Sequence, residues 1–315
     1  MKKVLITGAG GFVGFHLIHA LKALGDVEIY AAVYQATSDL TSLIPEDHIV
    51  AGDLTDFGFA QKLISISTPD VVYHLAALSV VHSSVGQATS VMNGNTTISY
   101  NILEAVRLGA PRARFVAISS GNVYGAVKDT TYPITESTPL RPLNPYAVSK
   151  VTQEMLALQY YLAYGLDVVI LRPFNHTGVG QTTDFVIPRL AKQFATIEKG
   201  LESPVIEVGN LETIRDFTDV SDMVKAYLLA ADKAVAGEIY NIGSGAGHTI
   251  REILEILKSL SPVKVEIKVK EDLVRTADVP VLIADASKFR QATDWEPKVS
   301  LNKTISDILE NYRQA

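Results

Sequence analysis

Two residues four positions apart, Tyr146 and Lys150, form the pair in this chain best suited to moving a proton. Side chains at i and i+4 share one face of a helix, so a helix over 145–164 would place the lysine ammonium beside the phenol. A neighbouring ammonium favours the phenolate, and we therefore expect the pKa of Tyr146 to fall from about 10 toward neutrality. Ser120 follows an expected strand and could hydrogen-bond the same substrate oxygen. The three residues predict proton transfer at a substrate oxygen; an exposed helix pair without a catalytic role is the alternative.

The start of the chain carries a second signature, three glycines between an apolar run and an amphipathic segment. Gly8 allows a tight turn off the strand, Gly11 lets the backbone approach a pyrophosphate, and Gly14 lets a helix pack close to the sheet. The helix N-terminus then presents free N–H groups and the positive end of its dipole to the anion. This strand–turn–helix context predicts a dinucleotide site, and a plain glycine turn is the alternative.

The elements that would position these residues alternate between β-rich runs and amphipathic helices as far as about residue 171. Runs of unbroken valine, isoleucine and leucine separated by helices indicate a parallel sheet covered on both faces. The sequence therefore predicts an α/β fold with a Rossmann-type doubly wound parallel sheet. The expected strands are Val4–Thr7, Glu28–Val33, His48–Ala51, Val71–Leu75, Arg114–Ile118 and Asp167–Leu171, and the expected helices are Phe15–Leu24, Phe57–Ile66, Ser90–Leu108 and Pro145–Tyr164.

The ends of the second, third and fourth strands bear on the cofactor. About 20 residues beyond the glycines, an Asp or Glu would hold a ribose 2′-hydroxyl, whereas an Arg would favour a 2′-phosphate. Val33-Tyr34-Gln35 offers neither, so NADP is preferred and NAD stays open. Asp53 could accept a hydrogen bond from an adenine amino group, or could instead cap the helix that begins near Asp56. His74 is expected to pack at its strand end rather than to bind a ligand.

The composition excludes several classes of protein. The 315 residues are 47% hydrophobic and 20% charged, as in an ordinary globular protein. A net charge of −6 without a cluster of Lys and Arg argues against nucleic acid as a partner. No apolar run approaches the ~18 residues of a membrane helix, and the N-terminus lacks the pattern of a signal peptide. Because there is no cysteine, disulfides and thiolate metal sites are excluded; no metal is expected, and the composition fits a cytoplasmic protein.

Four motifs in this order resemble the extended short-chain dehydrogenase/reductase family, whose members act on nucleotide sugars. They are Thr7-Gly8-x-x-Gly11-x-x-Gly14, the Ser120 turn ending in Val123-Tyr124-Gly125, Tyr146-x-x-x-Lys150 and Arg172-Pro173. The resemblance covers essentially the whole chain and implies Ser120, Tyr146 and Lys150 as catalytic residues. It also implies an NADP or NAD site made by Gly8, Gly11, Phe12, Val13, Gly14, Tyr34, Asp53, Leu54, Leu75, Ala76, Ala77, Asn95, Tyr146, Lys150 and Pro173.

Three later segments, 172–181, 208–220 and 275–280, are similar to the branch of the family that uses GDP-sugars. The likeness is closest to GDP-4-keto-6-deoxy-D-mannose reductase, with GDP-mannose 4,6-dehydratase as a near relative. Arginine forks suit a diphosphate, although Arg215 and Arg275 could instead pair with Asp216 and Asp278 at the surface. From their positions alone, Arg189 would be a solvated helix residue and Asn95 part of an ordinary polar face. The implied substrate contacts are Asn122, Asn175, Arg189, Arg215 and Arg275.

The predicted division into domains follows from the resemblance. Residues 1–173, joined by about 215–243, would form the dinucleotide-binding domain. Residues 174–210 and 244–315 would form a smaller mixed α/β lobe that binds the nucleotide sugar. In this lobe Thr249-Ile250-Arg251-Glu252 predicts a capping box for a helix over 250–260, and 263–269 alternates as a half-buried strand.

The residues after Ser120 separate the candidate reactions. Dehydratases of the family carry a Thr-Asp-Glu-like or Thr-Ser-Glu-like set where this chain has Ser120-Gly121-Asn122. Neither glycine nor asparagine supplies the acid and base that eliminate water, so dehydration is disfavoured. The expected reaction is NAD(P)H-dependent reduction of the C4 ketone of a GDP-4-keto-6-deoxyhexose to a GDP-deoxyhexose such as GDP-rhamnose. A nucleotide-sugar 4-epimerase with retained NAD is the alternative; a non-catalytic cofactor-sensing protein is disfavoured because Tyr146 and Lys150 are both present.

The resemblance also implies a homodimer held by a four-helix bundle. Each subunit would contribute the helices over 90–108 and 145–164. Ile98, Ile102, Met155 and Leu162 could form that apolar face or could equally face the sheet.

Overall fold

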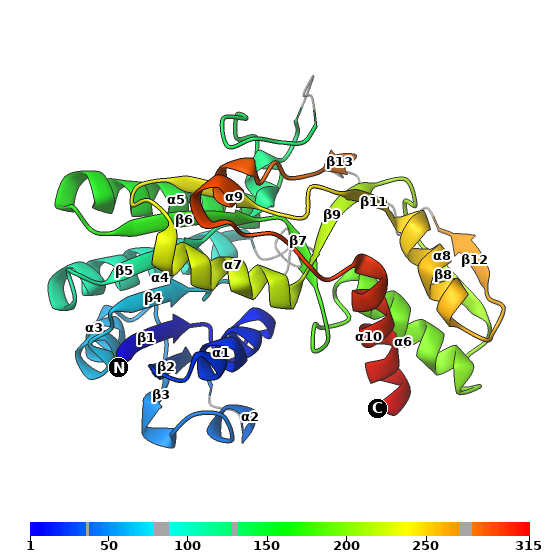
Figure 1. The fold of residues 1–315 in the computed structure, drawn as a ribbon, viewed down its shortest axis with the longest axis horizontal. Coiled ribbons are helices and arrows are strands. Elements are labelled where there is room, and N and C mark those ends of the chain that lie inside the picture. Colours follow the sequence, from blue (N-terminus) through cyan, green and yellow to red (C-terminus); the bar gives the residue numbers. More distant parts are fainter. Residues whose placement is uncertain (36–37, 79–87, 128–131, 271–278) are drawn as a thin grey trace.

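The computed structural model describes residues 1–35, 38–78, 88–127, 132–270 and 279–315 (Figure 1). Within these residues the main sheet has seven strands, all parallel, and its order reverses between β1 and β4. Such a reversal opens a crevice at the carboxyl ends of the strands, where ligands bind in doubly wound folds. The predicted fold class is therefore confirmed. The spatial order is β10 (Ile239–Ile242), β6 (Val168–Pro173), β5 (Arg114–Ile118), β4 (Val71–His74), β1 (Lys2–Thr7), β2 (Val27–Val33) and β3 (Ile49–Ala51).

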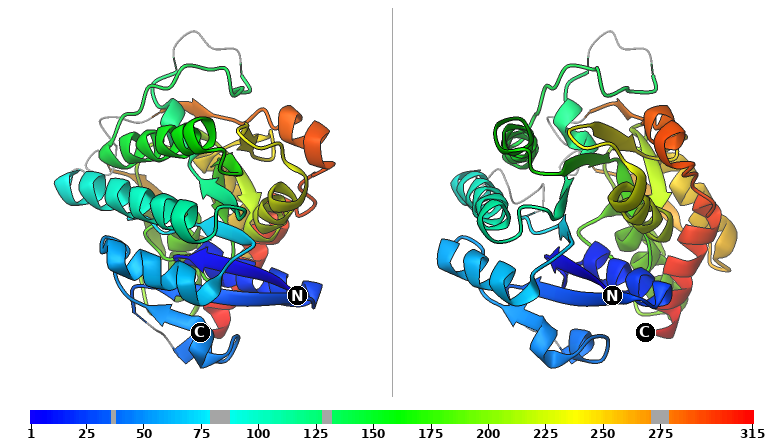
Figure 2. Two further views of the ribbon diagram at one scale, coloured as in Figure 1. Left: turned by 90° about the vertical axis from the view of Figure 1, so that its left-hand side faces the viewer. Right: turned by 60° about the vertical axis from the view of Figure 1, so that its left-hand side comes forward.

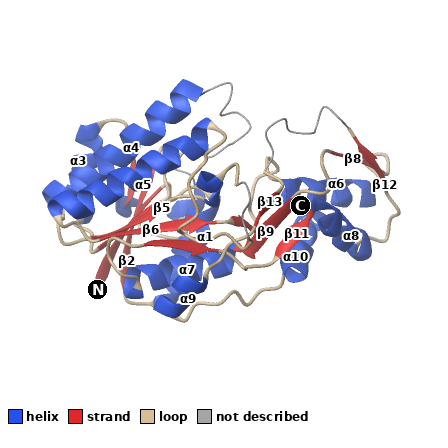
Figure 3. Ribbon diagram, turned by 90° about the horizontal axis from the view of Figure 1, so that it is seen from above, coloured by secondary structure: helices blue, strands red, loops and turns tan. Residues whose placement is uncertain are grey.

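Helices cover both faces of this sheet, as Figure 3 shows from above. The apolar side chains of the sheet separate into two buried clusters, one beneath each helical layer. Strands buried on both faces explain the unbroken apolar runs in the sequence. One layer holds α3 (Phe57–Ser67), α4 (Ala88–Gly109) and α5 (Pro145–Tyr164), and the other holds α1 (Phe12–Leu24), α7 (Val220–Lys233) and α9 (Ser287–Thr293).

Local signals define both ends of the helix that carries Tyr146 and Lys150. The Asn144 side chain accepts a hydrogen bond from the Ala147 N–H at 2.8 Å, and Pro145 occupies the first helical position. Gly165 ends the helix with a φ of 69°, a left-handed conformation that glycine adopts without strain. The observed bounds of α5 match the predicted ones because these signals are local.

A smaller lobe lies beside one end of the main sheet (Figures 1 and 3). Its core gathers the apolar faces of three helices, and Thr249 and Glu252 form the predicted capping box. Its helices are α6 (Val186–Glu198), α8 (Ile250–Leu260) and α10 (Leu301–Gln314); β9 (Ile214–Asp219) pairs with β7 (Asn175–Thr177), β11 (Gly247–Thr249) and β13 (Val281–Leu282), and β8 (Val205–Val208) pairs with β12 (Glu266–Val269).

Three short elements complete the described chain: α2 (Ser38–Thr41), η1 (Glu46–His48) and η2 (Gly121–Tyr124). The exact boundaries of the two predicted domains stay a prediction. No helix among those described is long and apolar enough to cross a membrane.

Candidate active site

A cavity of about 650 Å³ lies at the carboxyl ends of the main strands and extends toward the smaller lobe. It brings together most residues that the sequence singles out, from the glycine turn to the start of α5. The predicted site residues that line it are Gly8, Gly11, Phe12, Val13, Gly14, Tyr34, Leu75, Ala76, Ala77, Ser120, Asn122, Tyr146, Lys150, Pro173 and Asn175.

The glycine turn forms a tight cradle at one end of the cavity. A Cβ on Gly8 would lie 2.8 Å from the Ala76 nitrogen, and one on Gly14 would lie 2.5 Å from the Ala9 oxygen. The N-terminus of α1 has neither a side-chain cap nor an acidic residue in its first turn. Uncapped N–H groups and the positive helix dipole suit an anion, so these residues fit the pyrophosphate of a dinucleotide.

The residues after β2, which lie next to the glycine turn, bear on the choice between NADP and NAD. Tyr34 is 75% exposed and lines the cavity together with Gln35, whereas Asp53 and Leu54 do not line it. Asp53 accepts a hydrogen bond from the Thr55 N–H, and Asp56 caps α3. The alternative in which Asp53 caps that helix is therefore wrong.

Tyr146, Ser120 and Lys150 meet deep in the cavity. All three side chains are at most 9% exposed, and the Tyr146 phenol is hydrogen-bonded to Ser120. Burial raises the pKa of Tyr146 to about 12, and the Ser120 hydrogen bond opposes this rise. The prediction that Lys150 lowers this pKa toward neutrality is wrong for the observed geometry. The ammonium lies 5.9 Å from the centroid of the ring, and the desolvation of the phenolate dominates.

Lys150 is held by groups of the main sheet and of its own helix. Its Nζ donates hydrogen bonds to the Ile118 carbonyl at 2.7 Å and to the Gln153 Oε1 at 2.8 Å. Burial lowers the pKa of Lys150 to about 7, while the nearby Glu154 carboxylate raises it. The ammonium is therefore fixed at one side of the cavity, and its pKa lies close to neutral pH.

A buried ion pair between Arg172 and Glu154 lies near Lys150. Arg172 donates from Nε to the Glu154 Oε1 at 2.9 Å and from Nη2 to the Oε2 at 2.7 Å. The two side chains are 3% and 0% exposed, and Ser119 donates a further hydrogen bond to Glu154.

His74, as expected, packs at its strand end. It is fully buried and hydrogen-bonded to Thr7, and burial lowers its pKa to about 3.

The turn after β5 has no room for an acidic side chain at position 121. A Cβ on Gly121 would lie 2.9 Å from the ring of Phe174, which is itself 2% exposed. Asn122 lines the cavity beside it. The acid and base that elimination needs are therefore missing from both positions.

The far end of the cavity is lined by polar residues that sequence reasoning did not select. His176 stacks on Phe12 with ring centroids 6.4 Å apart, and its Nδ1 is hydrogen-bonded to the Phe174 carbonyl at 3.0 Å. Gln181 accepts a hydrogen bond from Thr177 at 2.7 Å. Their position within the segment 172–181, already marked by its likeness to GDP-sugar enzymes, was the only signal in the sequence.

Several predicted contacts lie away from this cavity. Asn95 donates a hydrogen bond to the Ser149 hydroxyl at 2.9 Å and accepts one from the Leu78 N–H, so it links α4 to α5. Arg189 on α6 and Arg215 on β9 do not line the cavity either. Arg275 lies outside the described residues.

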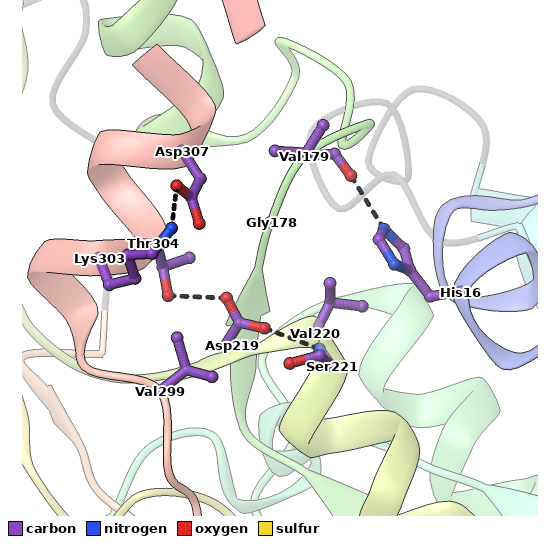
Figure 4. Close-up of a pocket in the computed structure, with 10 residues that line it drawn as sticks. All are labelled: His16, Gly178, Val179, Asp219, Val220, Ser221, Val299, Lys303, Thr304 and Asp307. Atoms are coloured by element: carbon purple, nitrogen blue, oxygen red, sulfur yellow. Dashed lines mark hydrogen bonds and ion pairs between the residues drawn. The ribbon is translucent and has the colours of Figure 1, made fainter. Parts of the chain in front are cut away.

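A second, smaller cavity of about 320 Å³ lies where α1, α7 and α10 approach one another (Figure 4). Its polar side chains bond to neighbouring parts of the protein: Asp219 accepts from Thr304 at 2.7 Å, and His16 bonds the Val179 carbonyl at 2.9 Å. Lys303 pairs with Asp307 in the same view. Of these bonds, the one from His16 joins a helix of the main sheet to the segment after β7. Over the described ranges, no cluster of three or more His, Asp or Glu side chains could hold a metal.

Comparisons with known proteins agree with this geometry. Residues 5–308 match the family model for GDP-mannose 4,6 dehydratase. The chain is 33% identical to a GDP-6-deoxy-D-mannose reductase of Pseudomonas aeruginosa, over 99% of this chain and 97% of that protein. It is 31% identical to a GDP-6-deoxy-D-talose 4-dehydrogenase of Aggregatibacter actinomycetemcomitans, over 91% and 90%. The structure of RMD from Pseudomonas aeruginosa complexed with NADPH superimposes with a TM-score of 0.87, at 32% identity and 99% coverage of both chains.

Proposed function

Because this chain belongs to the GDP-mannose 4,6-dehydratase family of extended short-chain dehydrogenases/reductases, which use NAD(P), we propose that it reduces the C4 ketone of a GDP-4-keto-6-deoxyhexose. The product would be a GDP-deoxyhexose such as GDP-rhamnose. One observation carries the choice of reaction: Tyr146, Ser120 and Lys150 share the cavity with Gly121 and Asn122, so a proton donor is present without an eliminating acid–base pair.

The cofactor, when bound, supplies the hydride. The cradle of Gly8, Gly11 and Gly14 would hold its pyrophosphate, and we prefer NADP because no carboxylate follows β2 at Tyr34 and Gln35. Asn122 and Asn175 would contact the nucleotide sugar.

The protein's own residues manage the proton. Because burial raises its pKa, Tyr146 holds its proton until negative charge develops on the sugar oxygen, and then donates it from its hydroxyl. Ser120 hydrogen-bonds the phenol and steadies the same oxygen. Lys150, which Ile118 and Gln153 hold in place, lines the cavity beside this phenol and would contact the cofactor.

Turnover with a defined substrate tests this proposal. The protein is mixed with GDP-4-keto-6-deoxy-D-mannose and NADPH or, separately, NADH, and the loss of the reduced nicotinamide is followed. One GDP-deoxyhexose for each nicotinamide oxidised supports the reductase. Interconversion of intact nucleotide sugars without added cofactor would instead identify an epimerase, and a 4-keto product would identify a dehydratase.

We further propose a homodimer formed through α4 and α5, which lie side by side on the outside of the molecule (Figure 2). Val148, Met155 and Leu162 recur every seven residues on α5 and are 37%, 46% and 72% exposed. Ile102, by contrast, is fully buried in the core and cannot belong to that face.

Light scattering tests the dimer with a matched pair of variants. Leu162→Glu should halve the mass of the particle, whereas Leu201→Glu, at a leucine 73% exposed on the smaller lobe, should leave it unchanged. A monomeric parent protein, or a Leu162→Glu variant of unchanged mass, would contradict the proposed interface.

A further inference from the structure

Tyr227 is a buried tyrosine with an unusual environment on α7. Its side chain is 0% exposed and lies in the apolar cluster between α1, α7 and the main sheet. Its hydroxyl has no hydrogen-bond partner among the described residues. Yet Tyr227 lines the large cavity together with Tyr146 and Ser120.

A phenol in such a place calls for a physical reason. Buried hydroxyl groups are nearly always hydrogen-bonded, and one without a partner destabilises the folded protein. Two buried tyrosines of this chain follow the rule: Tyr124 donates to Asn241 at 2.7 Å, and Tyr160 donates to Glu104 at 2.9 Å. Phenylalanine would fill the apolar cluster around Tyr227 equally well and without this penalty. The hydroxyl is therefore explained best by a ligand that enters the cavity.

The surroundings of Tyr227 indicate which ligand group it meets. The same apolar cluster packs against Phe12 and Val13 of the glycine turn and against Leu75 after β4, and all three also line the cavity. Tyr227 thus approaches the cavity from the side that holds the cofactor, close enough to Tyr146 for the charge of one phenolate to disfavour the other. Burial also raises the pKa of Tyr227, so its hydroxyl stays a hydrogen-bond donor at every working pH.

We propose that the Tyr227 hydroxyl donates a hydrogen bond to the carboxamide oxygen of the nicotinamide and so positions this ring beside Tyr146. Tyr227 is then a positioning residue for the cofactor. This inference rests on the proposed cofactor site, because it places the nicotinamide next to the proton donor. It adds a contact from α7, and neither the glycine turn nor the Tyr–Lys motif predicts that this helix contacts the cofactor.

The test compares cofactors with and without the nicotinamide. Binding of NADPH and NADH, and of 2′-phospho-ADP-ribose and ADP-ribose, is measured by calorimetry for the parent protein and for Tyr227→Phe. Loss of one neutral hydrogen bond should weaken binding of the preferred reduced cofactor about three- to tenfold. The nicotinamide-free counterpart should bind both proteins equally. Without ligand, Tyr227→Phe should unfold at the parent's temperature or above it, because an unpartnered hydroxyl has been removed.

Tyr160→Phe is the matched control. Its hydroxyl donates to Glu104 on the other side of the sheet, so this variant should lose stability and keep all affinities. Three results would overturn the inference. They are an unchanged affinity of Tyr227→Phe for the reduced cofactor, equal weakening of both ligand types, or a loss of stability like that of Tyr160→Phe. Failure of the parent protein to bind any of the four ligands would refute the cofactor site itself, which distinguishes the two failures.

Discussion

The buried pair between Arg172 and Glu154 offers a sharp test of how Lys150, a proposed catalytic residue, is supported. In Glu154→Gln the side chain keeps its shape but loses its charge, and one carboxylate oxygen becomes an amide NH2 group. Two charge-assisted hydrogen bonds, of 2.9 and 2.7 Å, converge on this carboxylate from Arg172. After the change, one N–H of the arginine faces another N–H, and a guanidinium that is 3% exposed has no counter-charge on Glu154.

The expected cost can be worked from this burial. Removing one partner of a buried ion pair costs about 3–5 kcal/mol, because the remaining charge stays desolvated. The unfolding entropy is about 2.1 cal/mol/K for each of the 315 residues, or about 0.66 kcal/mol/K in total. Glu154→Gln should therefore lower the unfolding temperature by about 5–8 °C. The matched control is Glu212→Gln, which breaks a pair whose side chains are 66% and 58% exposed and should cost less than about 1 kcal/mol.

Calorimetry of the two variants measures this difference, and the pH dependence of turnover gives a second, independent readout. Glu154 raises the pKa of Lys150, which burial holds at about 7. Without the carboxylate, the ammonium loses its proton at a lower pH, so the alkaline limb of kcat/KM should move toward acid. The reasoning fails if Glu154→Gln and Glu212→Gln unfold at the same temperature, or if the alkaline limb stays in place.

Three further variants follow from the same geometry. Tyr146→Phe should lower kcat about 100- to 10,000-fold while the Kd of NADPH is kept, because only the proton donor is lost; a kcat near that of the parent would contradict the assigned role. Gly14→Ala should weaken NADPH binding in a titration, because its Cβ would lie 2.5 Å from the Ala9 oxygen. Gly10→Ala should be tolerated, because the atom nearest to its Cβ is 3.6 Å away. Equal effects of the two variants on NADPH binding would argue against the cradle. Gln35→Asp should shift the ratio of kcat/KM for NADH over NADPH upward about tenfold or more, because a carboxylate holds a ribose 2′-hydroxyl and repels a 2′-phosphate; an unchanged ratio would separate Gln35 from cofactor choice.

Much of the fold could be predicted because its signals are local. The bounds of β5 and α5 match the predicted ones, and the capping box of α8 is formed by the expected residues. Helix α1 begins at Phe12, three residues before the prediction, because the glycine turn itself already enters the helix. The strands β7, β11 and β13 have two or three residues each and exist only through pairing with β9. No local pattern marks strands of that length.

The residues of the candidate site that belong to sequence motifs could be predicted. Those that reach the site only through the packing of the fold could not. The residues of the glycine turn and of the Tyr–Lys pair share one cavity, and the roles assigned to them stay predictions. In the sequence, Tyr227 is one more apolar position on an amphipathic helix. Only the structure shows that its hydroxyl has no hydrogen-bond partner within the described residues. The pKa of Tyr146 was predicted with the wrong sign because the spacing of Tyr146 and Lys150 shows proximity but not burial.

Transfer of a labelled hydride tests the central claim most directly. The protein is incubated with GDP-4-keto-6-deoxy-D-mannose and with NADPH that carries deuterium at the transferable position of its nicotinamide, and the product sugar is examined by NMR. We expect one deuterium on C4 of the GDP-deoxyhexose for each NADPH oxidised, and the same labelling pattern at a far lower rate with Tyr146→Phe. A product without deuterium at C4, or conversion of the sugar without oxidation of the nicotinamide, would contradict the proposed reduction.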